Sequence, residues 1–281
     1  MKGTVLLAAA AGLASVDGFT IPARMGADVL GPFKAGKALK VISGLNKFDA
    51  DLVQKVARAA DVGGATHIDI ACDPDLVRAA RAVSNVPVCV SAVDPELFVP
   101  CVEAGAAMVE LGNFDSFYEE GRTFSAEDVA DMARRTRQLL PEVPLSVTVP
   151  HTLHLEEQVA LAQELESLGA DVIQTEGKYS LDPSKGGVQG AIERAAPTLA
   201  AAYAIARAVD IPVMAASGLS EVTVAMALAA GAKGVGIGSV VNKLNDELGM
   251  VAVVTAVARA MKLEARAAPA PARARAAVKT V

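Results

Sequence analysis

The sequence of 281 residues has no tryptophan, and aromatic residues make up only 4% of it. It also lacks an internal apolar run of about 18 residues, the length that predicts a membrane-spanning helix. The formal net charge is −6, and no long basic run provides the electrostatic footprint needed to bind a phosphate backbone. We therefore expect no nucleic-acid partner and no membrane association of the mature protein.

Cysteine and histidine are also scarce. The three cysteines, Cys72, Cys89 and Cys101, have neither the even count of a disulfide framework nor Cys-x-x-Cys spacing, so we interpret them as small buried apolar residues. The three histidines show no spacing that makes a metal site with nearby carboxylates, and we predict none. A hydrophobic content of 52% with 21% charged residues predicts a globular protein with a sizeable core.

The two ends of the chain differ from its middle. Residues 1–36 read as a targeting segment and linker: Lys2 precedes an apolar run over 5–14, and small or neutral residues stand before Phe19. A signal peptide followed by phenylalanine looks like the two-part plastid address of algae with complex plastids, so we predict a plastid protein with this segment cleaved. Ordinary secretion and an uncleaved apolar helix are the alternatives. Residues 264–281, rich in Ala, Pro and Arg, predict a disordered tail.

Residues 37–263 alternate short β-rich runs with helical patterns, which is typical of parallel sheets built from βαβ units. Helices are expected at 48–61, 125–140, 155–168 and 247–261, the last packing beside the first. Because eight strands close a barrel, we predict an α/β fold consisting of a single (β/α)8 TIM barrel, with an open doubly wound sheet as the alternative. The predicted strands are 38–44, 66–71, 87–92, 107–112, 144–149, 171–176, 211–216 and 233–238.

Glycine-rich turns follow the last two predicted strands, where such barrels often bind phosphate. Glycine lets backbone N–H groups approach an anion, and a helix N-terminus adds its positive dipole end. We predict a phosphate or cofactor site here, the alternative being tight turns without a ligand. Its residues are Ser217, Gly218, Gly236, Gly238 and Ser239.

Polar residues interrupt strands that should be apolar if buried on both faces. Alternation along the strands places Lys40, Asp69, Glu110 and Glu176 on the barrel interior, and they are our catalytic candidates. A buried charge needs a partner, so we expect Lys40 to pair with Asp69 or Glu110. Lys40 would then act as a base or Schiff-base nucleophile with a lowered pKa, or stay charged and bind an anion. A purely structural ion-pair network is the alternative.

Two histidines lie at different ends of the predicted barrel, and two long loops complete its catalytic mouth at the carboxyl ends of the strands. His151, after the fifth strand, is an acid-base candidate or a solvated loop residue, whereas His67 begins its strand and is interpreted as structural. The aromatic loop 113–124 is expected to cover a flat ring or to pack against another subunit. The glycine-rich loop 177–189 is expected to be a mobile flap.

From about residue 37 to 261 the chain resembles the hypothetical chloroplast open reading frame 23 family of cyanobacteria and plastid genomes. The resemblance rests on ordered stretches such as ALKVISGLNKFDA, VCVSAVDPE, VELGNFDSF, LSVTVPH, AAPTLAAAY and GVGIGS. It implies a barrel and a plastid setting, but no reaction. The final turns, IPVMAASGLSEVTVAMALAAGAKGVGIGS, are also similar to those of flavin-mononucleotide oxidoreductases and of thiazole synthase, which implies a phosphate-bearing ligand.

Three functional hypotheses follow. The first is an enzyme, of lyase or synthase type, that acts on a phosphorylated small metabolite. The second is an FMN-dependent oxidoreductase that holds the flavin phosphate at the same turns. The third is a non-catalytic barrel that binds a phosphorylated metabolite in a regulatory role. Self-association into a homo-oligomer is compatible with each of them.

Overall fold

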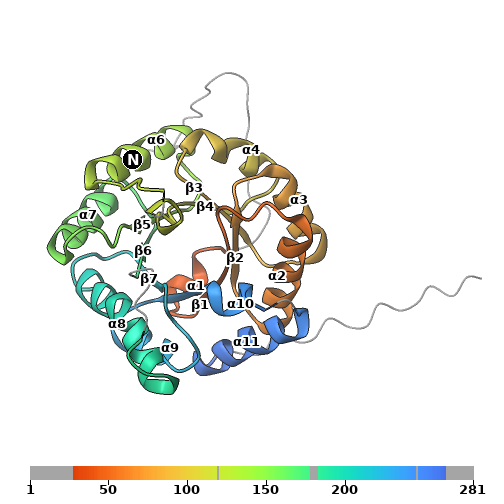
Figure 1. Ribbon diagram of the computed structural model, residues 1–281. Helices are drawn as coiled ribbons and strands as arrows, with labels where there is room; N and C mark the ends of the chain where they lie inside the picture. The colour runs from red at the N-terminus through yellow and green to blue at the C-terminus, as the bar shows by residue number, and fades with distance from the viewer. Residues whose placement is uncertain (1–27, 119, 178–182, 245, 264–281) are drawn as a thin grey trace, which may run out of the picture.

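The computed structural model describes residues 28–118, 120–177, 183–244 and 246–263, which form a closed barrel of eight parallel strands. Figure 1 looks along the barrel and shows the helices as an outer ring around the strands. Each strand pairs with its neighbours in chain order, and β1 closes the ring by pairing with β8. The prediction of a TIM barrel is confirmed, and the open doubly wound sheet is excluded.

The strands lie within one or two residues of their predicted positions. Alternating inward and outward residues give a strong pattern for buried parallel strands, and the flanking glycines and prolines mark their ends. The strands are Ala38–Gly44 (β1), His67–Ala71 (β2), Val88–Ala92 (β3), Met108–Leu111 (β4), Leu145–Val149 (β5), Val172–Thr175 (β6), Val213–Ala216 (β7) and Gly234–Ile237 (β8).

The helices follow the strands in turn, and α11 packs against α2, as expected. Arg58 of α2 and Glu247 of α11 join them by an ion pair with N···O 2.9 Å. The helices are Gly31–Lys34 (α1), Ala50–Gly63 (α2), Pro74–Val83 (α3), Phe98–Glu103 (α4), Asp115–Tyr118 (α5), Ala126–Leu139 (α6), Leu155–Ser167 (α7), Gly187–Ile205 (α8), Val224–Ala229 (α9), Ser239–Asn242 (α10) and Glu247–Ala260 (α11), and a 3-10 turn spans Pro95–Leu97 (η1).

Local signals set the ends of several helices. Ser125 and Asp128 form a capping box at the start of α6, in which each side chain bonds the other residue's backbone N–H. Gly169 ends the α7 segment with φ +90°, a left-handed conformation that favours glycine. The helix therefore stops and the chain turns directly into β6.

The barrel separates two buried regions. The outward side chains of the strands pack against the helices in one large apolar core. A smaller apolar cluster lies at the amino-terminal end of the barrel interior and consists of Val29, Phe33, Ala38, Cys89, Met108, Val172 and Met214. This cluster forms a floor beneath the polar interior.

The structure adds to the barrel a short segment that the sequence pattern places in the linker. Phe33 of α1 is fully buried in the floor, with its ring centroid 4.9 Å from that of His67. His67 Nε2 lies 2.8 Å from the Val29 carbonyl, which can only accept, so Nε2 carries the proton and Nδ1 accepts from the Thr66 hydroxyl. Burial lowers the pKa of His67 to about 4, so the ring is neutral and has a structural role.

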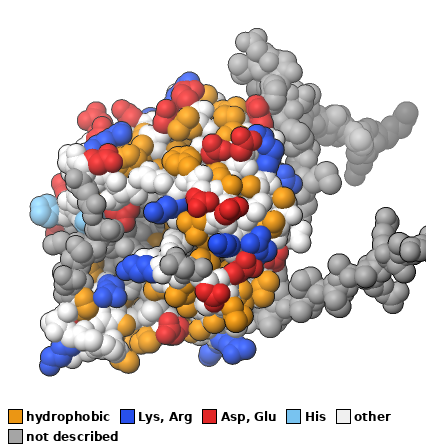
Figure 2. All heavy atoms as spheres, turned by 45° about the vertical axis from the view of Figure 1, so that its right-hand side comes forward, with side chains coloured by type: hydrophobic (Ala, Val, Ile, Leu, Met, Phe, Trp, Pro, Cys, Tyr) orange, Lys and Arg blue, Asp and Glu red, His pale blue; other side chains and the backbone are white. Residues whose placement is uncertain are grey.

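Several sequence predictions fall outside the described residues. These are the targeting segment up to residue 27, the tail 264–281 and residues 178–182 of the glycine-rich loop. On the face shown in Figure 2, acidic and basic side chains are interspersed. No helix in the described ranges is both long and apolar enough to cross a membrane.

Candidate functional site at the carboxyl ends of the strands

The barrel interior holds an ion pair between strands that are not neighbours. Lys40 of β1 and Glu110 of β4 pair through Nζ and Oε2, and both side chains are at most 1% exposed. Gln174 of β6 donates through Nε2 to Glu110 Oε1 at 2.7 Å and to Thr148 Oγ1 at 3.1 Å. Four strands thus contribute to one buried polar network, in which Lys40 pairs with Glu110, one of its two expected partners.

The network keeps Lys40 charged. Burial lowers its pKa, but the carboxylates of Glu110 and Asp69 outweigh that effect, and the pKa of Lys40 is raised above its ordinary value. A lysine with a raised pKa is a poor nucleophile because it remains an ammonium group. The raised pKa disagrees with the lowered pKa expected for a base or Schiff-base nucleophile, and it agrees both with a charged Lys40 that binds an anion and with a structural ion-pair network.

Asp69 lies beside this pair with its own partners. Its Oδ1 accepts from the Ser91 hydroxyl at 2.6 Å, and its Oδ2 accepts from Asn113 Nδ2 at 3.2 Å. Burial raises the pKa of Asp69 to about 6, even though Lys40 acts in the opposite direction. A carboxyl group that titrates near neutrality is suited to proton transfer.

Glu176 occupies a different position, at the rim. Its carboxylate accepts from the Asp115 N–H at 2.9 Å, the Tyr118 hydroxyl at 2.7 Å, and both the backbone N–H and Nδ1 of His151 at 3.1 and 3.0 Å. Burial, together with the Glu176 charge, raises the pKa of Tyr118. Glu176 therefore ties together the segments that follow β4, β5 and β6.

The aromatic residues of loop 113–124 are engaged with one another. Phe114 and Phe124 are buried, with ring centroids 4.5 Å apart, and the Arg122 guanidinium lies 4.6 Å from the Phe124 centroid. Phe117 packs edge-on against Phe124 at 5.7 Å. These ring contacts stabilise the loop from within.

The turn after β7 has an unusual backbone. Ser217 and Gly218 both have positive φ, +82° and +69°, and a Cβ atom on Gly218 would lie 2.5 Å from the Arg194 carbonyl oxygen. Thr198 of α8 donates to the Ala216 and Ser217 carbonyls at 3.1 and 2.8 Å, which fixes the turn. A non-glycine residue in this region is strained, and such strain is common at ligand-binding turns.

The backbone amides at this turn and at the turn after β8 are available. Within the described ranges, the N–H groups of Gly218, Leu219 and Gly238 donate to no carbonyl or side chain. Two buried oxygens in the same region, Ser220 Oγ and Asn242 Oδ1, also have no partner among these residues. Unpaired polar groups at this density favour a polar ligand.

Gly236, in contrast, is a packing residue. A Cβ atom at Gly236 would lie 2.9 Å from Ala216 Cβ and 3.0 Å from Ile42 Cδ1. Its side of β8 faces the crowded interior, below the turn, whereas Gly238 and Ser239 lie at the mouth. The predicted phosphate residues thus divide into four at the two turns and one within the strand.

Arg194 is a further candidate site residue, which was not predicted from the sequence. It lies on α8, with its Cγ 3.3 Å from the Cβ position of Gly218, and its exposed guanidinium forms no ion pair within the described part of the chain. The only sequence signal was its place just before the AAPTLAAAY stretch. The helical phase that turns Arg194 toward the β7 turn is not visible in one sequence.

The catalytic candidates therefore form two groups. Lys40, Asp69 and Glu110 lie together inside the barrel, while Glu176 and His151 bond to each other at the rim. Among the described residues, His, Cys, Asp and Glu form no group of three that could hold a metal ion.

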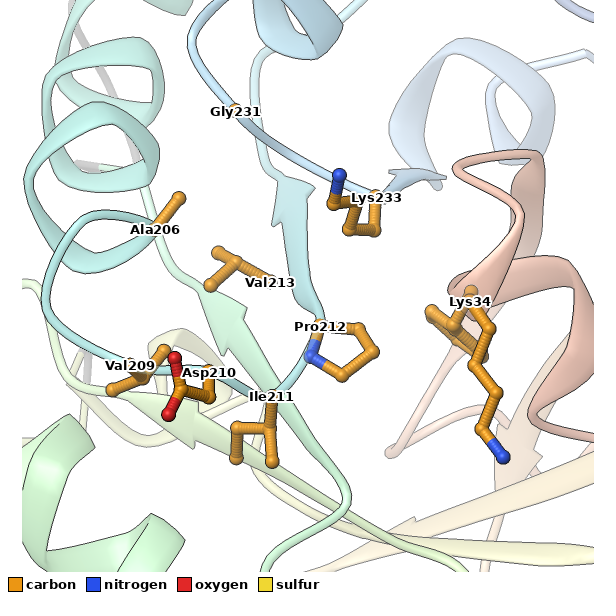
Figure 3. Close-up of a pocket in the computed structure, with 10 residues that line it drawn as sticks. Lys34, Ala206, Val209, Asp210, Ile211, Pro212, Val213, Gly231 and Lys233 are labelled. Atoms are coloured by element: carbon orange, nitrogen blue, oxygen red, sulfur yellow. The ribbon is translucent and has the colours of Figure 1, made fainter.

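Two pockets open on the opposite face of the barrel. One, of about 450 Å³, lies beside the amino ends of β7 and β8, and Figure 3 shows Lys34 and Lys233 at one side of it and Asp210 at the other. The other, of about 480 Å³, is lined by Thr66, His67 and Leu263, among others. Both are separated from the mouth by the apolar floor.

Comparison with known protein families gives a match over most of the chain. The model described as "Protein of unknown function (DUF561)" matches residues 25–266. The chain belongs to this family. Among the curated relatives of this DUF561 protein is "Uncharacterized protein ycf23" of Cyanophora paradoxa, 47% identical over 80% of this chain and 93% of the relative. The ycf23 protein of Pyropia yezoensis is 39% identical over 82% of this chain and 84% of the relative. These matches confirm the resemblance.

Solved structures with the same fold include three enzymes of low sequence identity. Thiamine phosphate pyrophosphorylase from Pyrococcus furiosus has a TM-score of 0.53 at 18% identity, covering 82% of this chain and 97% of that one. GGGPS from Thermoplasma volcanium has a TM-score of 0.57 at 12% sequence identity, and the match covers 84% of this chain and 97% of that one. A 3-hexulose-6-phosphate synthase has a TM-score of 0.56 at 16% sequence identity, and the match covers 79% of this chain and 99% of that one. At this identity the likeness shows the barrel fold alone.

Proposed function

We propose that this DUF561 protein is an enzyme that acts on a phosphorylated small metabolite. Its phosphate would bind at the turns after β7 and β8, and its reacting carbon would lie over the group formed by Lys40, Asp69 and Glu110. The observation that carries the proposal is a charged lysine beside a carboxyl group with a pKa of about 6. The names of two similar structures, thiamine phosphate pyrophosphorylase and 3-hexulose-6-phosphate synthase, add support for a phosphorylated substrate.

The proposed phosphate-binding site combines backbone and side-chain hydrogen-bond donors. The amides of Gly218 and Gly238 would donate to the phosphate oxygens, with Ser217 and Ser239 beside them, as backbone N–H groups do in other anion sites. Arg194 would add a charge-assisted, bidentate contact from α8. The strained backbone at Ser217 is consistent with a turn kept for binding.

The interior group supports proton transfer next to a stabilised anion. Asp69 would move a proton to or from the substrate carbon, and the Lys40 ammonium would stabilise negative charge on an adjacent oxygen. Glu110 and Gln174 would hold Lys40 in place. Glu176 and His151 would fix the loops above them, with His151 available to assist proton transfer at the rim.

One observation favours the non-catalytic reading as a second candidate. Lys40, Asp69 and Glu110 are all at most 1% exposed, and Asn113 closes over Asp69. Turnover therefore requires the Asn113 side chain to move away from Asp69. A barrel that only binds a phosphorylated metabolite at its rim needs no such movement.

A thermal-shift titration tests the phosphate site. Phosphorylated three- to seven-carbon metabolites and inorganic phosphate should raise the unfolding midpoint, and the dephosphorylated counterparts should not. R194Q should weaken binding about tenfold, the loss expected for one charge-assisted contact. R207Q is the matched control, because Arg207 follows α8 and stacks on Tyr203 at 3.4 Å. Equal stabilisation by dephosphorylated compounds would reject the site.

Turnover separates the two candidate functions. Metabolites that bind are incubated with the protein, and products are followed by mass spectrometry. D69N should retain binding and lose conversion if Asp69 transfers the proton. Tight binding without conversion by the wild-type protein would favour the regulatory barrel. An absorption spectrum of the purified protein tests the FMN hypothesis, which requires bound flavin.

The plastid setting rests on the relatives. Proteins named ycf23 in the algae Cyanophora paradoxa and Pyropia yezoensis cover most of this chain, and the predicted N-terminal address agrees with that setting. We infer import into the plastid, which a fluorescent fusion of residues 1–36 would test.

A further inference from the structure

Two of the three cysteines lie next to each other in the folded protein. Cys72 follows β2 directly, at the carboxyl end of that strand, and Cys101 lies in α4. Their Sγ atoms are 3.5 Å apart although the residues are 29 positions apart in the chain. Sequence spacing gives no sign of this contact, because two βα units have to pack before the two thiols meet.

The two thiols have different surroundings. Cys72 is partly exposed, whereas Cys101 is buried. The single proton of the Cys72 thiol has two possible acceptors, Cys101 Sγ and the Leu97 carbonyl oxygen at 3.3 Å. The hydrogen bond that Cys72 donates lowers the pKa of Cys101 and raises the pKa of Cys72, so Cys101 is the thiolate of the pair and Cys72 keeps its proton. The pair thus combines a sulfur that solvent can reach with a second sulfur ready to react.

We propose that Cys72 and Cys101 form a reversible disulfide bond, so that the rim of the barrel beside β2 carries a redox modification site. Bond formation requires the Sγ atoms to move from 3.5 Å to about 2.05 Å apart. Cys72 stands in a turn, just before the N-cap Asp73 of α3, where a small shift does not disturb a strand. Cys89 is fully buried within the barrel floor and takes no part.

A low-molecular-weight disulfide is an oxidant of the required class. The Cys72 sulfur attacks one sulfur of the oxidant and forms a mixed disulfide, and the small thiol that leaves takes up the Cys72 proton. The Cys101 thiolate then attacks the Cys72 sulfur, forms the intramolecular bond and releases the second small thiol. Two electrons pass from the cysteine pair to the oxidant, and the two cysteine protons end on the two released thiols. A small dithiol reverses the reaction.

The bond would connect the turn that follows the Asp69 strand to α4. It closes the chain segment from residue 72 to 101, which contains α3 and β3. Such a closure restricts the unfolded chain, so the oxidised protein should unfold at a higher temperature than the reduced protein. The inference is independent of the proposed function.

The experiment uses the full chain, first reduced and then incubated with oxidised glutathione at neutral pH. Intact-mass spectrometry should show the loss of two hydrogen atoms, and thiol labelling under denaturing conditions should find one free cysteine. Cleavage at Asp94 or Glu96 separates Cys89 from Cys101, so peptide mapping identifies the linked pair. Dithiothreitol should restore three free thiols.

Variants provide the controls. C89A should still form the bond, whereas C72S and C101S should not form an intramolecular bond, with circular dichroism confirming that each variant folds. Three free thiols in the oxidised wild-type sample would overturn the proposal. So would a persistent glutathione adduct on Cys72 or a dimer linked through Cys72, because either shows that Cys101 does not complete the exchange.

Discussion

Lys40 and Glu110 form an ion pair across the interior of the barrel, from strands β1 and β4 that do not touch in the sheet. Each charge is removed from water and depends on the other, and Gln174 holds the second carboxylate oxygen. Breaking one side of such a pair leaves an uncompensated buried charge, which is more costly than removing both.

The first prediction concerns this pair. K40M should lower the free energy of unfolding by about 3–5 kcal/mol at pH 7, because the Glu110 carboxylate loses its partner in a buried environment. E110Q keeps the acceptor for Gln174 but removes the carboxylate that bonds Lys40 and leaves only the Asp69 carboxylate near it, so E110Q should also be destabilised. Urea unfolding measures both.

The double variant K40M/E110Q is the control for this prediction. It should be clearly more stable than the sum of the two single losses implies, since both partners of the ion pair are removed together and Asp69 keeps its bonds from Ser91 and Asn113. Strictly additive losses would show that the two charges do not interact, and would contradict the pairing.

The second prediction concerns pH dependence. The pKa of Asp69 is raised to about 6, so the folded state binds the extra proton between about pH 4 and 6, and stability decreases as pH rises through that window. The pKa of His67 is lowered to about 4, so there the unfolded state binds the extra proton, and stability increases with pH up to about 6.5. Each effect amounts to about 3 kcal/mol over its window. In the wild-type protein the two slopes oppose each other.

Single variants should reveal the opposing slopes. D69N removes the aspartate contribution, so its stability relative to the wild type should fall on acidification from pH 6.5 to 4. H67Q removes the histidine contribution, and its relative stability should rise over the same change. Urea unfolding at several pH values gives both differences, and parallel curves for all three proteins would show that neither group titrates as inferred.

The sequence allowed the strands and the inward polar residues to be predicted, because alternation in buried parallel strands is a local signal. It did not decide whether Lys40 pairs with Asp69 or Glu110, since that choice depends on distances across the closed barrel. The position of Phe33 in the floor was also missed, because the four residues of α1 carry no periodicity. Similarly, the contact of Arg194 with the β7 turn depends on how α8 is rotated against the barrel.

The third prediction concerns Glu176 as the anchor of three rim segments. E176Q removes the charge that accepts bonds from Asp115, Tyr118 and His151, so backbone amides at 113–118 and 150–153 should exchange with deuterium faster. Y118F removes the hydroxyl that bonds Glu176 and the Thr152 side chain but leaves the other Glu176 bonds in place, so it should speed exchange in both segments by less than E176Q does. Hydrogen exchange with mass spectrometry resolves the two segments, and unchanged exchange in E176Q would mean that other contacts hold the rim.

The fourth prediction uses two glycines with similar backbone conformations. Gly218 and Gly121 have φ of +69° and +78°, so alanine at either position is strained and should cost about 1 kcal/mol from the backbone alone. At Gly121 nothing lies within 4 Å of the new Cβ atom, whereas at Gly218 the Arg194 carbonyl oxygen is 2.5 Å away. G218A should therefore be destabilised by clearly more than G121A. It should also lose stabilisation by phosphorylated ligands, because relieving the clash moves the turn whose amides would bind phosphate. Urea unfolding with and without ligand separates the two effects. Equal losses of unfolding free energy in G218A and G121A would show that the turn moves freely. Retained ligand stabilisation in G218A would place the phosphate elsewhere.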